Sequence, residues 1–232
     1  MELDHGLAAM FGVVIVAAGQ SIRMGGTDKI FADLGGKPVL AHSVQIFHDR
    51  SFVGQIVIVL NESSLEQGRQ LVERRGWHKV TALRPGGLRR QDSVVNGLMA
   101  LDGCPWVAIH DGARPLVRRE TIERGCVEVQ RHGAAAAAVP VKDTVKVADA
   151  DGFVRDTPER AALWLAQTPQ LFRFDIIQDA CRRPSGNVTD DASLVERAGY
   201  KVKLFMGSYD NIKITTPDDL ELAHALLTGV KG

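Results

Sequence analysis

The sequence contains few cysteines and no excess of charge of either sign. The three cysteines, Cys104, Cys126 and Cys181, lie far apart and form no C-x-x-C pair. Neither a zinc site nor a disulfide framework follows from this spacing, and reduced structural thiols are predicted. Lys plus Arg and Asp plus Glu both total 28, which argues against a general nucleic-acid binder. Any anionic ligand must therefore be bound by cations that the fold gathers locally.

Long apolar runs are also missing. No stretch approaches the roughly 18 apolar residues that a membrane span needs, and the first ten residues, MELDHGLAAM, contain two acids and no Lys or Arg. This is the wrong start for a secretory signal, so the cytoplasm is the expected location. With 232 residues, the chain fits one α/β domain, residues 1–232, large enough to bury roughly 70–75% of its unfolded surface.

Short apolar runs alternate with helical patterns along the chain. Strands are predicted at residues 12–18, 55–60, 79–82, 106–109, 134–140 and 201–206, and helices at 38–49, 64–75, 91–101, 121–132, 174–183, 190–199 and 218–227. This alternation is typical of an α/β fold with a Rossmann-like, mostly parallel sheet and helices on both faces. The second helix is expected to be capped by Ser64.

Two segments have ambiguous patterns. The run AAAAAVP has the alanine content of a helix, but a helix has just ended at Gly133 and Pro140 closes the run, which favours a buried strand. The segment from Val141 to Phe172 has many turn residues and few large apolar side chains. It is therefore predicted to be an extended β excursion outside the core.

The loop AAGQSIRMGGTDK follows the first predicted strand, at the carboxyl edge where α/β sheets bind ligands. Its small residues Ala17, Ala18 and Gly19 let backbone amides approach an anion closely. Arg23 and Lys29 add two cations to the same loop. The loop matches neither G-x-G-x-x-G nor G-x-x-x-x-G-K-[ST], which disfavours a dinucleotide fold and a P-loop ATPase. A glycine-rich turn with solvated cations is the alternative.

Two further motifs lie at the same predicted edge. In the turn RPGGLRR, three arginines, the last of them Arg90, precede Ser93; they can bind a phosphate or a base, or form a solvated loop. In HDGARP, Asp111 and Arg114 place a carboxylate and a guanidinium just past a buried strand. Asp-Gly is also a common turn pair, so a purely structural role is the alternative there.

Four candidate residues are ordinary when each is taken alone. Taken alone, Thr144 is predicted to be a strand residue and Arg160 an exposed side chain. Thr168 is predicted to lie in a turn, and Lys213 to be a solvated lysine. The histidines, His110 among them, show no metal-ligand spacing and are expected to be exposed or satisfied by hydrogen bonds.

The motifs occur in the order AAG-x-S-x-RM-G, K-x-F, D-S-V, HDGARP, PV-K-DTVK, R-x-x-LW-x-AQTPQ-x-F, TDDAS and DNIKITTP-x-DL. In this order they resemble the 2-C-methyl-D-erythritol 4-phosphate cytidylyltransferase family of the non-mevalonate isoprenoid pathway. The resemblance runs from Val13 to Leu227. AQTPQ and DNIK together are its most specific parts, whereas the N-terminal loop marks only the wider nucleotidyltransferase class.

The resemblance implies that CTP and 2-C-methyl-D-erythritol 4-phosphate react to give 4-diphosphocytidyl-2-C-methyl-D-erythritol and pyrophosphate, with Mg²⁺ as cofactor. It also implies a homodimer in which a protruding β arm, about residues 141–171, embraces the partner. The implied catalytic residues are Arg23, Lys29, Arg160 and Lys213; the nucleotide-binding residues are Ala17, Ala18, Gly19, Arg90, Ser93 and Asp111; the acceptor-binding residues are Asp111, Arg114, Thr144, Arg160, Thr168, Thr189 and Lys213. Asp111 is also the expected metal ligand.

Four places depart from the family's pattern, one of them the pair Thr27-Asp28 before Lys29, where a proline is usual. Ser21 stands where a glycine of the N-terminal loop is common, and Ile30 follows Lys29 where a glutamine is common. Leu88 occupies a turn position that is frequently polar, so one contact to the ribose or base is expected to be missing.

Three other functions remain as alternatives. The first is a cytidylyltransferase for another polyol phosphate, such as ribitol 5-phosphate, because the shape of the acceptor pocket decides between the two substrates. A Rossmann oxidoreductase is disfavoured because no G-x-G-x-x-G follows the first strand. A catalytically inactive nucleotide sensor is disfavoured because every charged candidate residue is retained.

Overall fold

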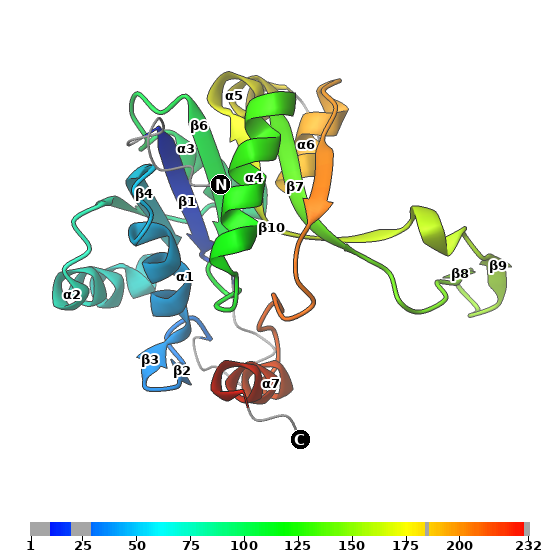
Figure 1. Cartoon of the computed structure of the whole chain (residues 1–232), viewed down its shortest axis with the longest axis horizontal. Coiled ribbons are helices and arrows are strands. Elements are labelled where there is room, and N and C mark those ends of the chain that lie inside the picture. The colour runs from blue at the N-terminus through cyan, green and yellow to red at the C-terminus, as the bar shows by residue number, and fades with distance from the viewer. Residues whose placement is uncertain (1–9, 20–28, 184–185, 230–232) are drawn as a thin grey trace.

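The computed structural model describes residues 10–19, 29–183 and 186–229, and a seven-stranded sheet lies at their centre (Figure 1). Its strands are β1 Phe11–Ala17, β4 Val53–Leu60, β5 Val80–Pro85, β6 Trp106–Asp111, β7 Ala134–Pro140, β10 Trp164–Arg173 and β11 Lys203–Met206. They lie in the order β11-β7-β10-β6-β1-β4-β5. Only β10 runs antiparallel to its neighbours, which confirms the mostly parallel sheet.

Helices cover both faces of this sheet (Figure 1). They are α1 Val39–His48, α2 Leu65–Arg75, α3 Arg90–Leu98, α4 Arg119–His132, α5 Phe174–Arg182, α6 Asp191–Arg197 and α7 Pro217–Thr228, with short 3₁₀ turns η2 Glu62–Ser64 and η3 Arg160–Ala162. Two small two-stranded sheets lie outside it, one of β2 Asp33–Leu34 and β3 Lys37–Pro38, the other of β8 Val147–Ala148 and β9 Val154–Asp156. No helix in the described residues is long and apolar enough to cross a membrane.

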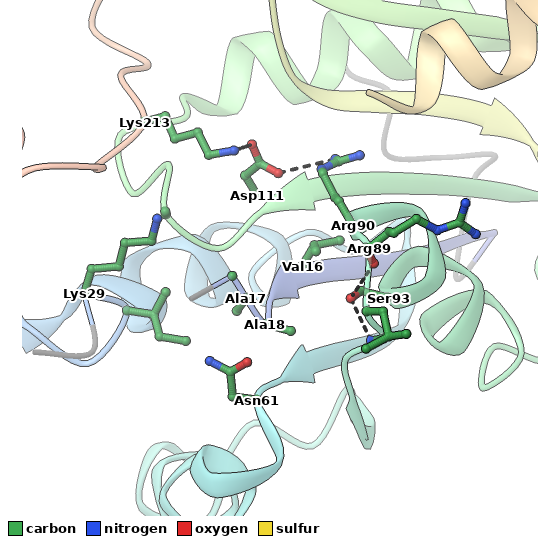
Figure 2. Close-up of a pocket in the computed structure, with 15 residues that line it drawn as sticks. Val16, Ala17, Ala18, Lys29, Asn61, Arg89, Arg90, Ser93, Asp111 and Lys213 are labelled. Carbon is green, nitrogen blue, oxygen red and sulfur yellow. Dashed lines mark hydrogen bonds and ion pairs between the residues drawn. The ribbon is translucent and has the colours of Figure 1, made fainter. Parts of the chain in front are cut away.

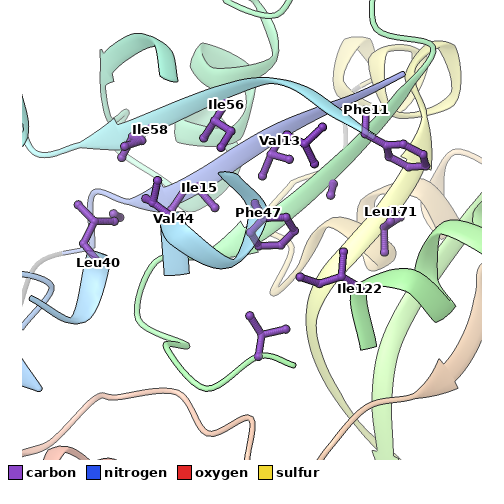
Figure 3. Packing of buried hydrophobic residues seen from close by; sticks show 14 of the residues in the cluster. Phe11, Val13, Ile15, Leu40, Val44, Phe47, Ile56, Ile58, Ile122 and Leu171 are labelled. Carbon is purple, nitrogen blue, oxygen red and sulfur yellow. The ribbon is translucent and has the colours of Figure 1, made fainter. Parts of the chain in front are cut away.

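The alternation of side chains along β1 divides the core into two layers. Val13 and Ile15 point to the face covered by α1, α2 and α4, where they belong to one buried cluster with Phe47 and Ile122 (Figure 3). Val14 points to the opposite face, which α3, α5 and α6 cover. Successive strand residues face opposite sides of a sheet. A strand that is buried on both faces therefore has an unbroken run of apolar residues in its sequence.

The alanine run is a strand, as predicted. β7 pairs with β10 on one side and β11 on the other, and its five alanines are fully buried. The helix before it, α4, ends at Gly133, whose φ of 79° is left-handed. The helix propensity of alanine is overridden because α4 ends at Gly133 and the alanines that follow form hydrogen bonds with β10 and β11.

The predicted β excursion is only partly correct. Its first part, through β8 and β9 to η3, protrudes from the body as an arm (Figure 1). Its last residues are core: β10 lies between β6 and β7, and Leu171 and Phe172 are buried on opposite faces of the sheet. The prediction was wrong there because the strand carries buried polar residues, whose partners lie in distant parts of the chain.

The prediction of a serine cap on the second helix is also wrong. The Ser64 side chain makes no capping hydrogen bond, and the chain enters α2 through the turn η2 instead. Side-chain caps occur at two later helices: Asp190 accepts a hydrogen bond from the Ser193 amide at α6, and Thr216 forms a capping box with Asp219 at α7.

Helix α3 lies close to the sheet at Gly97. A Cβ atom at this position would lie 2.4 Å from Val14 Cγ1 and 3.1 Å from Val59 Cγ2. Alanine favours an exposed helix over glycine by about 1 kcal/mol, but overpacking a core costs about 1–3 kcal/mol. We expect Gly97→Ala to lower the free energy of unfolding, measured by urea denaturation, by about 1–2 kcal/mol.

The control is Glu73→Ala on the exposed face of α2, which should change stability by no more than about 0.5 kcal/mol. A Gly97→Ala protein more stable than the wild type would show that α3 can move away from the sheet.

Candidate active site

A cavity of about 400 Å³ opens at the carboxyl ends of β1, β4 and β6 (Figure 2). It is lined by Val16, Ala17, Ala18, Gly19, Lys29, Ile30, Asn61, Gly87, Leu88, Arg89, Arg90, Ser93, Asp111, Ala113 and Lys213. Eight of these were predicted as site residues: Ala17, Ala18, Gly19, Lys29, Arg90, Ser93, Asp111 and Lys213. Arg23 and the departure Ser21 lie outside the described residues.

Asp111 is the centre of the charged part of this cavity. Its buried carboxylate lies 2.9 Å from Lys213 Nζ, 3.3 Å from Arg90 Nη2 and 3.6 Å from Arg114 Nε. Burial acts to raise the pKa of Asp111, but the three cations outweigh it and hold the pKa well below its usual range. Asp111 is therefore ionised throughout the physiological range.

Arg90 is held by a second carboxylate that the sequence analysis did not single out. Its guanidinium donates to Asp191 through Nη1 at 2.9 Å and through Nη2 at 2.8 Å. This two-pronged pairing fixes the plane of the guanidinium as well as its position. Asp191 lies in the motif TDDAS, at the first position of α6, and only the fold brings it to α3.

A hydrogen-bond chain lies behind Asp111. The Asp111 amide donates to Thr168 Oγ1 at 3.0 Å, and that hydroxyl lies 3.0 Å from His110 Nδ1. His110 Nε2 lies 3.1 Å from the Arg114 carbonyl oxygen, which can only accept. Burial lowers the pKa of His110 to about 4, so the ring is neutral, with its proton on Nε2 and Nδ1 accepting from Thr168. Thr168 is thus a buried support of the site.

Lys213 and Arg114 are positioned by the segment that leads into α7. Arg114 Nη1 donates to the Asn211 carbonyl at 2.7 Å, and the Ile214 amide donates to the Ala113 carbonyl at 2.8 Å. Asn211 is fully buried, and its side chain donates to the Thr168 carbonyl at 2.8 Å. The segment is therefore tied to the turn after β6 and to β10, through residues that flank Lys213.

The turn between β5 and α3 forms the opposite wall. The Gly87 amide donates to Ser93 Oγ at 3.0 Å, and this hydroxyl donates to the Arg89 carbonyl at 3.3 Å. A Cβ atom at Gly86 would lie 2.3 Å from Ala18 Cβ, so only glycine lets the turn lie this close to the end of β1. Ser93 is thus in the cavity wall, with its hydroxyl engaged in ordering the turn.

Three predicted residues lie away from the cavity. Thr144 and Arg160 are exposed on the arm, where Arg160 Nη1 donates to the Lys142 carbonyl at 3.1 Å. Thr189 is exposed just before α6. Within the described part of the chain, no group of three or more His, Cys, Asp or Glu side chains could hold a metal ion.

Asn61, Arg89 and Asp191 are not among the site residues predicted from the sequence. Asn61 directly follows β4, and its position at the carboxyl edge of a predicted strand was a usable signal. Arg89 was part of the recognised arginine cluster, without a role of its own. Asp191 gave no local signal of its pairing, because its partner is about a hundred residues away in the chain.

Neutral His110 makes stability depend on pH. Its pKa falls from 6.5 in the unfolded chain to about 4 in the fold, so its stabilising contribution is complete above pH 6.5 and is lost as the pH falls toward 4. The shift corresponds to about 3 kcal/mol. We expect His110→Asn to be less stable at pH 7 and to lose about 3 kcal/mol less between pH 7 and 4, by urea denaturation.

Gly97→Ala is the control, since its packing defect should lower stability by the same amount at each pH. If His110→Asn keeps the wild-type pH dependence, His110 is not the titrating group.

Known proteins are similar to this chain over most of its length. The family model of 2-C-methyl-D-erythritol 4-phosphate cytidylyltransferase matches residues 11–229. A cytidylyltransferase of this name from Dehalococcoides mccartyi is 52% identical over 216 residues, which are 93% of this chain and 95% of that relative.

Solved structures show the same fold. The 4-diphosphocytidyl-2C-methyl-D-erythritol synthase of Anaerococcus prevotii superposes with a TM-score of 0.84 at 30% identity, over 94% of this chain and 96% of that one. The 2-C-methyl-D-erythritol 4-phosphate cytidylyltransferase of Thermus thermophilus has a TM-score of 0.77 at 33% identity, over 94% and 98%. Both the sequence match and the fold extend over nearly the whole chain. The chain therefore belongs to the 2-C-methyl-D-erythritol 4-phosphate cytidylyltransferase family.

Proposed function

We propose that this chain transfers a cytidylyl group from CTP to 2-C-methyl-D-erythritol 4-phosphate, giving 4-diphosphocytidyl-2-C-methyl-D-erythritol and pyrophosphate. The observation that carries this function is the cation-lined cavity at the carboxyl end of the sheet, in a chain that belongs to the family. A chain with zero net charge concentrates Lys29, Arg89, Arg90 and Lys213 around one cavity. Such a cluster suits a polyanion.

The reaction requires positioning and charge neutralisation more than covalent chemistry. A phosphate oxygen of the acceptor attacks the α-phosphorus of CTP, the bond to the β-phosphate oxygen breaks, and pyrophosphate leaves. A phosphate monoester is already a nucleophile, so no activated serine or cysteine is needed. Two polyanions must instead be held in line against their mutual repulsion.

The roles proposed for the residues are those that the family resemblance implies, and the cavity lining supports several of them. Ala17, Ala18 and Gly19 would hold the nucleotide through backbone amides, beside the wall that contains Ser93. Arg23 and Lys29 would stabilise charge at the α-phosphate. Arg90 would help to hold the nucleotide, Asp111 and Arg114 would lie between the nucleotide and the acceptor, and Lys213 would bind the acceptor phosphate. Thr168 would act by supporting Asp111 from behind. Thr144, Arg160 and Thr189 would hold the acceptor.

Asp111 fits a magnesium ion of the kind that a nucleotide brings. Mg²⁺ commonly binds one or two carboxylates together with substrate phosphates, without an all-protein cage. Among the described lining residues, Asp111 offers an ionised carboxylate, which suits that mode. When bound, the ion would neutralise charge on the triphosphate.

The arm carries features of an interface between two copies of the chain. Large apolar side chains are exposed on the arm and the neighbouring strand ends; they are Val147, Phe153, Val154, Trp164, Leu165, Leu204, Met206 and Tyr209. Exposed apolar groups gathered in this way mark interaction sites. A cation–π contact connects the base of the arm to the segment after β11: Lys142 Nζ lies 3.6 Å from the centre of the Tyr209 ring. A homodimer would let Thr144 and Arg160 reach the partner's cavity.

The substrate assignment predicts a selective assay. CTP, 2-C-methyl-D-erythritol 4-phosphate and Mg²⁺ should release pyrophosphate, and ribitol 5-phosphate should give a much lower kcat/KM. The measurement is pyrophosphate release with four nucleoside triphosphates and a panel of polyol phosphates. A higher kcat/KM for ribitol 5-phosphate would overturn the acceptor assignment, and preference for another nucleotide would overturn the use of CTP.

Shared sites predict complementation between two inactive variants. Arg160→Ala and Lys213→Ala homodimers should each be nearly inactive, since the first loses a residue given to the partner's site and the second one of its own. After equal mixing and subunit exchange, half the dimers contain one intact site and one doubly damaged site. Activity per chain should recover to about a quarter of the wild-type value, by the statistics of a two-fold assembly.

Each variant carried alone through the same exchange is the control, and mass-tagged chains confirm that exchange has occurred. Exchange without recovery would mean that Arg160 serves its own subunit, and the shared-site arrangement would be wrong.

A further inference from the structure

The cavity has a charged side and a neutral side (Figure 2). Asp111, Arg90 and Lys213 lie on the charged side, and Lys29 lies between Lys213 and Asn61. Asn61 lies on the other side of the cavity from Asp111, below Ala18. A nucleoside triphosphate has the same division, with charge confined to the phosphates and a neutral base at its other end. If the phosphates of the nucleotide bind the cations, its base lies toward Asn61.

The neutral side offers two uncharged polar side chains among the described lining residues, those of Asn61 and Ser93. Ser93 is already engaged, because its hydroxyl accepts from the Gly87 amide and donates to the Arg89 carbonyl. Its donor proton is therefore directed into the protein. Ser93 orders the wall, and Asn61 is the better candidate for contact with a ligand.

The amide of Asn61 points into the cavity (Figure 2). Its backbone carbonyl accepts from the Ser64 amide at 2.9 Å, which fixes the residue at the end of β4. No hydrogen bond from the rest of the described chain engages its side chain. An asparagine amide has two donor hydrogens and an acceptor oxygen, and here all of them are available to a ligand.

The surroundings of Asn61 suit a flat ring. The Gly86 amide donates to the Leu60 carbonyl at 2.8 Å, so the turn lies directly beside the end of β4. Gly86 is so close to Ala18 that no side chain fits between them. Leu88 exposes its whole apolar side chain at the rim. Backbone and small or apolar side chains thus form the walls, and a polar amide lies at one edge.

We infer that the Asn61 side chain hydrogen-bonds the edge of the cytosine ring of CTP, as a nucleotide-binding residue additional to those proposed above. Cytosine offers an amino donor beside ring-nitrogen and carbonyl acceptors, which match the acceptor and donors of an amide. The inference rests on the proposed use of CTP.

The test compares ligands that share phosphates but differ at the nucleoside. In Asn61→Ala, the Kd of CTP should rise about 3- to 10-fold, the loss expected for one or two hydrogen bonds. The KM for CTP should rise by a similar factor with kcat unchanged, since the base is distant from the reacting phosphorus. Binding of inorganic tripolyphosphate should stay at the wild-type value. The matched control, Glu62→Ala, changes the next residue, which does not line the cavity, and should leave all these values unchanged.

Three outcomes would overturn the assignment of Asn61. CTP binding that is unchanged in Asn61→Ala would remove it from the site. Equal weakening of tripolyphosphate would mean that the substitution disturbs the phosphate side. An effect that is present with CTP but absent with 2′-deoxy-CTP would mean that Asn61 binds the ribose. Failure of the wild-type protein to bind CTP would instead overturn the proposed function itself.

Discussion

The buried carboxylate of Asp111 is the constraint on which the site depends. An unpaired charge in this position would cost several kcal/mol, and Lys213, Arg90 and Arg114 compensate it from three different segments. The relation is mutual, because three cations this close would repel one another without the carboxylate between them. The protein thereby holds a cluster of positive charge in place before any ligand arrives.

Other residues of the fold position each of these groups through hydrogen bonds. Asp191 orients Arg90 from α6, and Asn211 binds Arg114 through its backbone carbonyl. Thr168 and neutral His110 support the Asp111 backbone from within the sheet. These supports are mostly neutral or paired, so they add little charge of their own. Polar residues buried in the sheet therefore serve to position the charged ones.

The residues proposed to bind the acceptor are divided between the cavity and the arm. The cavity at the sheet edge contains the backbone loop and cations suited to a triphosphate, whereas Thr144 and Arg160 lie on the arm. An arm that lies outside the core gains its stability from what it contacts, and its exposed apolar side chains suit a second copy of the chain. Assembly of the site would then be coupled to assembly of the dimer.

The sequence by itself determined the parallel sheet, the alanine strand and most of the cavity wall. Short β-branched apolar runs favour strands that are buried on both faces. The carboxyl ends of parallel strands lie at one edge of the sheet, so motifs that follow different strands come together there. Tertiary structure alone decided the antiparallel strand β10, the pairing of Arg90 with Asp191, and the neutral state of His110. Each of these depends on buried polar groups whose partners lie far away in the chain, and no local pattern records a long-range partner.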